Sequence, residues 1–282
     1  MECQTRLDHV VINVRRDMDP AEALCRSLGF TITPRGYHSL GSINHLMMFG
    51  TDYFELIGLP KMGTTKRDDL ITAPLGINGL VFKTTDVDDT HAHLVALGIA
   101  GEPPRAFSRP VELDGVTSDA KFRTVTVRPE VFSAGRVYFC EHGTPDLVWR
   151  PEWQSHANGA MEIAEVVVVA EDVPSVAAEY GKLVEGEVVV LRGGVRAIDI
   201  ADTRLTFRTP DGYREQYGDL ASDMGGRDSI FGALVFRTAS LALVAGILEG
   251  LPNQTATTIG PESIVVRLAE YDSVLEFIGP EE

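Results

Sequence analysis

One strand-like pattern recurs four times along the chain, and it limits the possible folds more than any other feature of the sequence. Residues 7–14 read LDHVVINV, and the stretches at 77–84, 163–170 and 231–238 are equally rich in β-branched and aromatic residues, which is typical of buried strands. Aligned at residues 9, 79, 165 and 233, the stretches lie 70, 86 and 68 residues apart. Such spacing indicates a repeated structural module.

A helical pattern and further strand-like segments follow the repeated stretches. Helices are expected at 19–28, with Asp19 as N-cap and Pro20 at the first helical position, at 87–97 after Asp86, and at about 174–183 and 241–248. Each module therefore consists of one strand, one helix and three more strands. The later strands are expected at 31–33, 45–49, 53–58, 187–191, 196–200, 205–208, 255–259, 263–268 and 273–278. Module two is longer because of an insertion at 102–136.

Pairing of the modules follows from the need to bury both faces of each sheet. A four-stranded module with one helix leaves an open face and exposed edges, so two modules are expected to close into a half-barrel. The prediction is an α+β fold of four βαβββ modules in two domains, residues 1–150 and 162–282. Residues 151–161 would join them.

Charge and composition exclude several classes of function. The 282 residues carry a net charge of −16, which disfavours binding to nucleic acid and to anionic membranes. Three scattered cysteines do not make a disulfide framework or a thiolate zinc site. No apolar run is long enough for a membrane helix, and the first residues are polar. We expect a cytoplasmic protein that binds a small molecule, with a homodimer as one possible assembly.

Three motifs of the first module resemble those of the vicinal oxygen chelate superfamily and, within it, the glyoxalase-like domain proteins. They are LDHVVI at 7–12, GSINHLM at 41–47 and YFELI at 53–57, and the module pattern covers nearly the whole chain. The resemblance implies a cupped sheet around a divalent metal that chelates adjacent substrate oxygens. Such proteins include glyoxalase I, extradiol ring-cleaving dioxygenases, epimerases and the metal-free bleomycin-resistance type of binding protein, so the fold alone leaves the reaction open.

The resemblance places metal ligands at His9 in the first strand and at Glu55 in the fourth strand of module one. The local sequence also supports Glu55 as a ligand, because a carboxylate between Phe54 and Leu56 is costly to bury unless it pairs or binds metal. A lone strand histidine such as His9, by itself, is more often a core residue. Alternation puts Leu7, His9 and Val11 on one face.

Module two supplies the third candidate ligand. Aligning residues 53–58 with YFCEHG at 138–143 puts Cys140 in the place of Glu55 and His142 in the place of Ile57. Gly79 occupies the position where a fourth ligand could stand. The expected set is therefore His9, Glu55 and His142, which leaves open positions and suits Fe²⁺, Mn²⁺, Co²⁺, Ni²⁺ or Zn²⁺.

Other residues are candidates for acid–base chemistry and for substrate binding. His38, His45, Glu141 and Tyr138 are candidate general bases, with no basis for choosing among them. The module-two insertion is basic, and its Arg105, Arg109 and Arg123 are candidates for binding an anionic or oxygen-rich substrate, with Trp149 as a pocket wall. Modules three and four are read as scaffold, because they offer Glu165, Thr206 and Glu276 but no histidine at the corresponding positions.

These features predict a divalent-metal-dependent enzyme acting on a small oxygen-rich substrate. The reaction would be of the lyase, isomerase or ring-cleaving dioxygenase type, with the metal acting as a Lewis acid. Neither a nucleotide-binding glycine motif nor a serine-hydrolase elbow is present. The first alternative is a metal-free protein of the same fold that binds or sequesters a small molecule. A second is an interaction scaffold, which predicts that His9 and Glu55 lie far apart.

Overall fold

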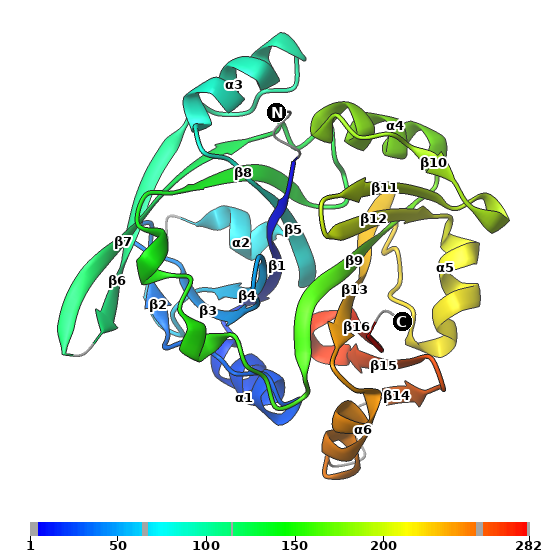
Figure 1. Ribbon diagram of the computed structural model, residues 1–282. Coiled ribbons are helices and arrows are strands. Elements are labelled where there is room, and N and C mark those ends of the chain that lie inside the picture. Colours follow the sequence, from blue (N-terminus) through cyan, green and yellow to red (C-terminus); the bar gives the residue numbers. More distant parts are fainter. Residues whose placement is uncertain (1–4, 64–66, 114, 252–255, 281–282) are drawn as a thin grey trace.

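The computed structural model describes residues 5–63, 67–113, 115–251 and 256–280, and its strands form two eight-stranded sheets (Figure 1). The first sheet has the order β2-β3-β4-β1-β5-β8-β7-β6 and the second the order β10-β11-β12-β9-β13-β16-β15-β14. The two orders become identical when each strand of the first sheet is replaced by the strand eight places later. This correspondence confirms the α+β fold of four modules paired in two half-barrels.

The strands alternate with six α-helices in the described part of the chain. The first sheet contains β1 (Leu7–Arg15), β2 (Gly36–Tyr37), β3 (Ile43–Met48), β4 (Tyr53–Gly58), β5 (Gly76–Lys83), β6 (Arg105–Leu113), β7 (Val116–Thr126) and β8 (Arg136–His142). The second contains β9 (Ala160–Ala170), β10 (Val189–Val190), β11 (Arg196–Ile200), β12 (Thr203–Arg208), β13 (Ser229–Thr238), β14 (Ala256–Ile259), β15 (Ser263–Leu268) and β16 (Ser273–Ile278). The helices are α1 (Met18–Ser27), α2 (Asp68–Thr72), α3 (Val87–Ala96), α4 (Val173–Val184), α5 (Pro210–Tyr217) and α6 (Leu241–Glu249).

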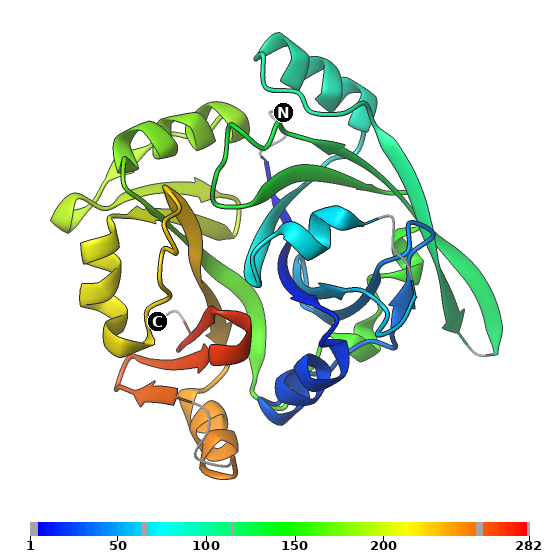
Figure 2. The same cartoon turned by 180° about the vertical axis from the view of Figure 1, so that it is seen from behind.

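Each sheet is built around the first strands of its two modules. β1 pairs antiparallel with β5, and β9 pairs antiparallel with β13. The last strand of each module pairs parallel with the first strand of the same module, as β4 does with β1 and β8 with β5. The sheets curl so that each has a concave inner face, here called the first cup and the second cup (Figure 2).

The four first strands share an irregularity at the same place. In the central strand pairs, the register skips Asp8 on β1, Asn78 on β5, Ala164 on β9 and Gly232 on β13. Each skipped residue stands directly before one of the aligned positions 9, 79, 165 and 233. A β-bulge turns two consecutive side chains toward the same face. Each skipped residue and the aligned residue after it therefore share the concave face. The residues that flank these pairs point to the other face and pack in the largest core of the protein, here called the outer core. They are Leu7, Val10, Ile77, Leu80, Ile163, Val166, Phe231 and Leu234.

Several predicted elements need correction. Residues 31–33 are not a strand, and β2 at Gly36–Tyr37 takes that place; the strand expected at 187–191 shrinks to Val189–Val190. Asp17 rather than Asp19 occupies the N-cap position of α1. The expected insertion is the long hairpin β6–β7, so module two lengthens its middle strands instead of adding a segment. Thr255, expected in a strand, lies outside the described residues.

The largest core lies between the two sheets and beneath the outer helices. It spans both halves of the chain and contains an aromatic group in which Phe30 lies 5.0 Å from Phe54 and 5.5 Å from Phe236, measured between ring centroids. Smaller apolar clusters line the first and second cups. Within the described residues, the structure contains no helix with the length and apolar character needed to cross a membrane.

Candidate functional site

His9 and Glu55 face each other inside the first cup. They come from the parallel neighbours β1 and β4, and their side chains are 5% and 7% exposed. His9 Nε2 lies 3.6 Å from Glu55 Oε2, while the amide of Asn44 on β3 donates to Glu55 Oε1 at 2.6 Å. One carboxylate oxygen is therefore held by Asn44, and the other is directed at the imidazole. This proximity excludes the scaffold arrangement in which the two residues lie far apart.

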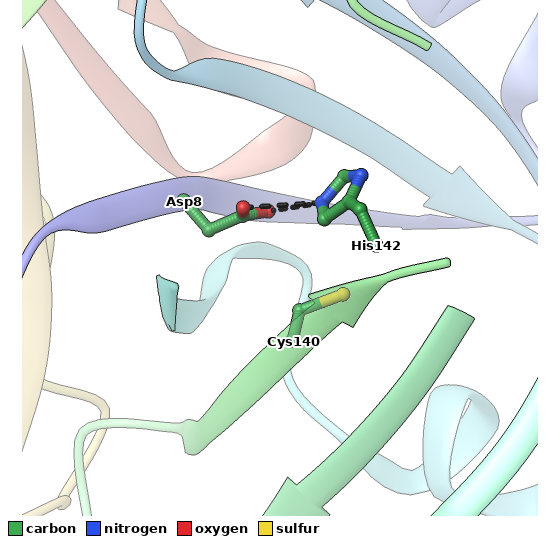
Figure 3. A group of neighbouring side chains, drawn as sticks. All are labelled: Asp8, Cys140 and His142. Carbon is green, nitrogen blue, oxygen red and sulfur yellow. Dashed lines mark hydrogen bonds and ion pairs between the residues drawn. The ribbon is translucent and has the colours of Figure 1, made fainter. Parts of the chain in front are cut away.

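The bulge on β1 adds a residue that alternation did not predict. Asp8 points into the first cup, toward His142 (Figure 3), and its Oδ1 also accepts a hydrogen bond from His9 Nδ1 at 2.6 Å. Leu7, expected on the face of His9, packs in the outer core instead. With Nδ1–H donated to Asp8, the neutral form of His9 directs the lone pair of Nε2 at Glu55.

Asp8 is a fully buried carboxylate that remains ionised. Burial alone would raise its pKa, but the charge and hydrogen bond of His142, together with those of His9, outweigh burial and hold the pKa of Asp8 well below its ordinary value. Lys83 Nζ, 3.7 Å from Asp8 Oδ2, adds a further positive charge, and the same ammonium lies 3.8 Å from the centre of the Trp149 ring. Asp8 thus orders several side chains around it.

His142 lies on a different side of His9 from Glu55. Its Nε2 is 3.1 Å from the Asp8 carboxylate, and Asp8, Cys140 and His142 offer ligand atoms that all lie within 4.8 Å of one another. Burial raises the pKa of the Cys140 thiol well above its ordinary value. Since Asp8 contacts the Nδ1 edge of His9 and Glu55 faces the Nε2 edge, the expected set of His9, Glu55 and His142 does not converge on one point.

Tyr138 completes the surroundings of His9 Nε2. Its hydroxyl oxygen lies 3.4 Å from that nitrogen, and burial raises the pKa of the Tyr138 phenol above its ordinary value. The ring of Tyr53 stacks on the imidazole of His9 with centroids 4.4 Å apart. These contacts fix the plane of the His9 ring and place a neutral hydroxyl beside its lone pair.

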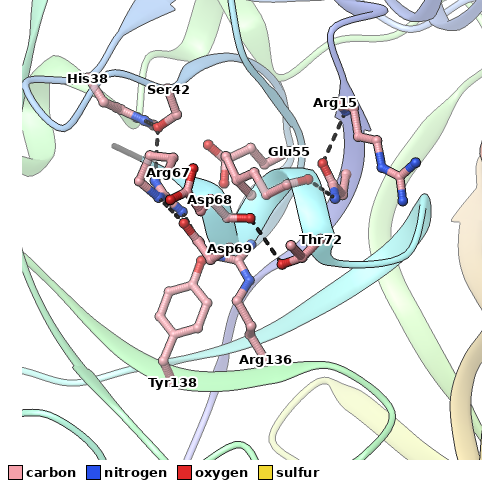
Figure 4. Close-up of polar contacts among 12 residues, drawn as sticks. Arg15, His38, Ser42, Glu55, Arg67, Asp68, Asp69, Thr72, Arg136 and Tyr138 are labelled. Atoms are coloured by element: carbon pink, nitrogen blue, oxygen red, sulfur yellow. Dashed lines mark hydrogen bonds and ion pairs between the residues drawn. The ribbon is translucent and has the colours of Figure 1, made fainter. Parts of the chain in front are cut away.

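A polar cluster around α2 covers the side of the first cup next to Glu55 (Figure 4). Arg67 donates to Ser42 at 3.1 Å and to both carboxylate oxygens of Asp69, and Ser42 also contacts His38 Nδ1 at 2.8 Å. Burial lowers the pKa of His38 to about 4, although the nearby charge of Glu55 opposes this effect. His38 is therefore a neutral imidazole at neutral pH.

The other candidate residues divide between the first cup and its outside. Trp149 and Arg109 line the inside. His45 lies beneath α1, where its Nε2 is 2.9 Å from Glu22, and Glu141 accepts a hydrogen bond from the Val87 amide at the start of α3. Arg123 pairs with Asp88 outside the cup, and Arg105 is exposed at the start of β6.

The carboxylates of the second cup are paired with hydroxyl groups of its own side chains. Thr206 donates to Glu165, and Tyr217 on α5 donates to Glu276 at 2.8 Å. Burial raises the pKa of Glu165 above its ordinary value. A cavity of about 590 Å³ lies beside Glu165, yet the seven histidines of the chain all precede residue 160. This half therefore has space and carboxylates but no imidazole.

The pair formed by His9 and Glu55 fits a divalent metal. Two ligand atoms each about 2.1 Å from one ion lie about 3.4 Å apart at a tetrahedral angle, close to the 3.6 Å between Nε2 and Oε2. The Asp8 carboxylate behind a ligating histidine is the usual outer contact of such sites. Sequence reasoning missed Asp8 and Asn44; the signal for Asp8 was a carboxylate directly before the strand histidine.

Comparison with known proteins gives a consistent result. The model of the glyoxalase-like domain family matches residues 7–184. Comparison with curated proteins returns no match. A hypothetical protein from Staphylococcus aureus has a similar structure, with a TM-score of 0.67 and 11% identity, and the match covers 98% of this chain and 100% of that one.

Two further solved structures are similar over most of this chain. A mutant of 4-hydroxymandelate synthase from Streptomyces coelicolor has a TM-score of 0.59 at 14% identity, covering 98% of this chain and 92% of that one. A xylose isomerase-like TIM barrel/4-hydroxyphenylpyruvate dioxygenase fusion protein has a TM-score of 0.57 at 12% identity, covering 97% of this chain and 49% of that one. At such identities the likeness concerns the fold, whereas the family model matches well over half of the sequence itself. The chain belongs to the glyoxalase-like domain family.

Proposed function

We propose that this protein is a divalent-metal-dependent enzyme whose metal is held by His9 and Glu55 in the first cup. The carrying observation is the 3.6 Å approach of His9 Nε2 to Glu55 Oε2, with the opposite nitrogen of His9 bound to Asp8. The neutral form of His9 turns the lone pair of Nε2 toward the Glu55 carboxylate, and these two atoms repel in a buried site unless a proton or a metal ion lies between them. Two of the solved structures that share this fold are named for enzymes, 4-hydroxymandelate synthase and 4-hydroxyphenylpyruvate dioxygenase, which supports an enzymatic role.

The substrate would be a small molecule with two adjacent oxygens. When bound, a divalent metal supplies Lewis-acid stabilisation of the negative charge that develops on such oxygens. The chain's own residues then exclude water and orient the substrate: Tyr53 and Trp149 form apolar walls, and Asn44 holds the Glu55 carboxylate. With only two strong protein ligands facing each other, the site leaves several positions for substrate oxygens.

Proton handling in this site falls to Tyr138 or His38. Tyr138 presents a neutral hydroxyl 3.4 Å from His9 Nε2, so it can donate a hydrogen bond to a developing oxyanion. His38 is neutral at neutral pH and has a lone pair available as a proton acceptor. His45 and Glu141, which point away from the cup, have no part in this proposal.

Metal analysis of the purified protein tests the proposal. After growth with Fe, Mn, Zn and Ni, we expect about one divalent ion per chain in the wild type and a loss of at least tenfold in the His9→Ala/Glu55→Ala double variant, because the imidazole and the carboxylate are both gone. A matched control is His45→Gln, which removes a buried histidine of the same module outside the cup and is expected to keep the metal.

The outcomes separate the competing functions. A wild type with no stoichiometric metal would favour the metal-free binding protein. Metal retained by the double variant but lost by Cys140→Ser would place the ion on Asp8, Cys140 and His142 instead. With the metal identified, a redox-active iron would favour ring-cleaving oxygenation, and a redox-inert ion would favour isomerisation or lyase chemistry.

A further inference from the structure

Arg109 is a buried guanidinium inside the first cup. It lies on β6 between Phe107 and Val111, which both face the same apolar cluster, and its side chain is 3% exposed. The charge of the Glu55 carboxylate acts on it across the cup, and no ion pair joins Arg109 to the described part of the chain. Arg109 thus points at the centre that contains His9 and Glu55.

Arg109 lacks a partner for its charge within the described residues. No side-chain hydrogen bond or ion pair joins it to the described part of the chain, and its Nη2 is buried and unsatisfied. Burial lowers the pKa of Arg109 below its ordinary value. An unpaired buried charge destabilises a fold strongly, and Arg is suited to bidentate binding of a carboxylate.

The backbone beside Arg109 makes room for its side chain. A Cβ atom on Gly36 would lie 2.9 Å from Arg109 Cδ and would also meet the Oδ1 atom of Asn44, which has no hydrogen-bond partner. Any larger residue at position 36 would displace both groups. Gly36 therefore allows Arg109 and Asn44 to lie side by side above the cup.

A cavity connects Arg109 with the outside. It has a volume of about 250 Å³ and lies where loop 33–35 approaches β6, with Val111, Trp153 and Arg109 in its wall. The two edge strands of the sheet, β2 and β6, approach each other nearby, where Ser39 after β2 donates its backbone N–H to the carbonyl of Ser108 on β6 at 2.8 Å. Ligand pockets usually measure about 300–1,000 Å³, so this one suits a small molecule.

We propose that Arg109 binds the carboxylate of a small organic acid, so that the substrate of the first cup is an anion with an apolar body. This inference rests on the proposed function in placing the acid next to the metal site. The carboxylate of the acid supplies the bidentate partner that Arg109 lacks among the described residues. The apolar body of the acid packs against Phe107, Val111 and Trp153. Two other guanidinium groups nearby, Arg67 beside the cup and Arg35 in the cavity wall, are already paired with carboxylates.

Ligand titration with benzoate, benzamide and inorganic phosphate tests the proposal. The two tryptophans of the chain, Trp149 and Trp153, lie in the cup and in the cavity wall, so their fluorescence reports binding directly. We expect the wild type to bind benzoate at least tenfold more tightly than its neutral isostere benzamide and more tightly than phosphate. Arg109→Gln should weaken benzoate binding by about 10- to 100-fold. The control Arg105→Gln, an exposed position of the same strand, should leave it unchanged.

Stability supplies a second readout that does not depend on affinity. Arg109→Met removes an unpaired buried charge, so its melting temperature without ligand should exceed that of the wild type, while benzoate should raise the melting temperature of the wild type only. Gly36→Ala should weaken benzoate binding through displacement of Arg109. A lower melting temperature of Arg109→Met together with absent benzoate binding to the wild type would show a structural role and overturn the proposal.

Titrations before and after removal of metal by a chelator keep the two proposals apart. Benzoate binding through Arg109 in a protein that holds no metal supports the acid subsite while the metal proposal fails. Metal bound at His9 and Glu55 with benzoate affinity unchanged in Arg109→Gln overturns the subsite and leaves the metal proposal standing. Equal affinity for benzamide, or binding of phosphate alone, also overturns the assignment to an organic acid.

Discussion

At the scale of single residues, Asp8 determines how the first cup presents its histidine. The carboxylate accepts a proton-bearing Nδ1 and thereby leaves Nε2 as the free lone pair of His9. It also draws His142 to itself at 3.1 Å. Asp8 contacts neither the metal nor the substrate in the proposed reaction, yet it determines which nitrogen of His9 is available as a metal ligand.

Replacing Asp8 by Asn tests this positioning role. We expect Asp8→Asn to fold and to bind its metal about 10- to 100-fold more weakly, because the neutral amide holds the His9 tautomer less firmly. A chelator competition measures the affinity. The control Asp199→Asn changes an exposed carboxylate that pairs with Arg204, and it should have no effect. Metal affinity unchanged in Asp8→Asn would contradict the role assigned to Asp8.

The sequence indicates some of these residues and conceals others. Glu55 is visible as a carboxylate within an apolar strand, and His9 as the polar residue of its stretch. Asp8 is hidden because strict alternation assigns it to the opposite face, and the bulge that reverses it depends on pairing with β5, which lies some seventy residues away. The missing partner of Arg109 is likewise a property of the assembled cup.

At the scale of elements, short helices between the modules fill the cups. α2 brings Leu70 into the apolar cluster of the first cup, and α5 brings Tyr213 and Tyr217 into that of the second. Neither helix was predicted, because each is short and follows a strand without a repeated pattern. The strands at 53–58, 196–200, 263–268 and 273–278 were predicted with their observed limits, since turn residues flank each apolar run.

The contact between α5 and β16 is open to measurement. Tyr217→Phe removes the hydroxyl that donates to the buried carboxylate of Glu276 at 2.8 Å, so we expect a loss of about 1–3 kcal/mol in the free energy of unfolding. Urea denaturation provides the value. The double variant with Glu276→Gln should lose less than the two single changes together, and the exposed Tyr37→Phe is the control. A loss below about 0.5 kcal/mol for Tyr217→Phe would show that this bond does not hold α5 in place.

At the scale of the whole molecule, the two sheets are joined by a shared core and by a buried carboxylate. Asp52, between β3 and β4, accepts a hydrogen bond from the backbone N–H of Ile163 on β9 at 3.1 Å. Burial raises the pKa of Asp52 to about 7, and the hydrogen bonds from Ile163 and Thr51 only partly oppose it. The contact between the sheets therefore contains a group that titrates near neutral pH.

This pKa predicts how stability depends on pH. The folded-state pKa of Asp52 lies above the ordinary value of about 3.9, so its contribution is fully present below pH 4 and is lost as the pH rises through about 7. Relative to Asp52→Asn, the wild type should lose on the order of 2–4 kcal/mol between pH 4 and pH 9. Denaturation at several pH values gives the difference. A difference that stays flat with pH would mean that Asp52 titrates normally in the folded protein.

The four bulges bear on how this chain came to differ between its halves. Their recurrence one residue before each aligned position is most simply explained by descent of the modules from one ancestral unit, whose backbone kink was inherited with every duplication. Diversification then needed only an exchange of side chains at inherited positions. In the second half, Ala164 occupies the position of Asp8 and borders an existing cavity of about 590 Å³. That half retains the backbone found beside His9 in the first half and also has the space, so a few substitutions could place a polar cluster there without remodelling the fold.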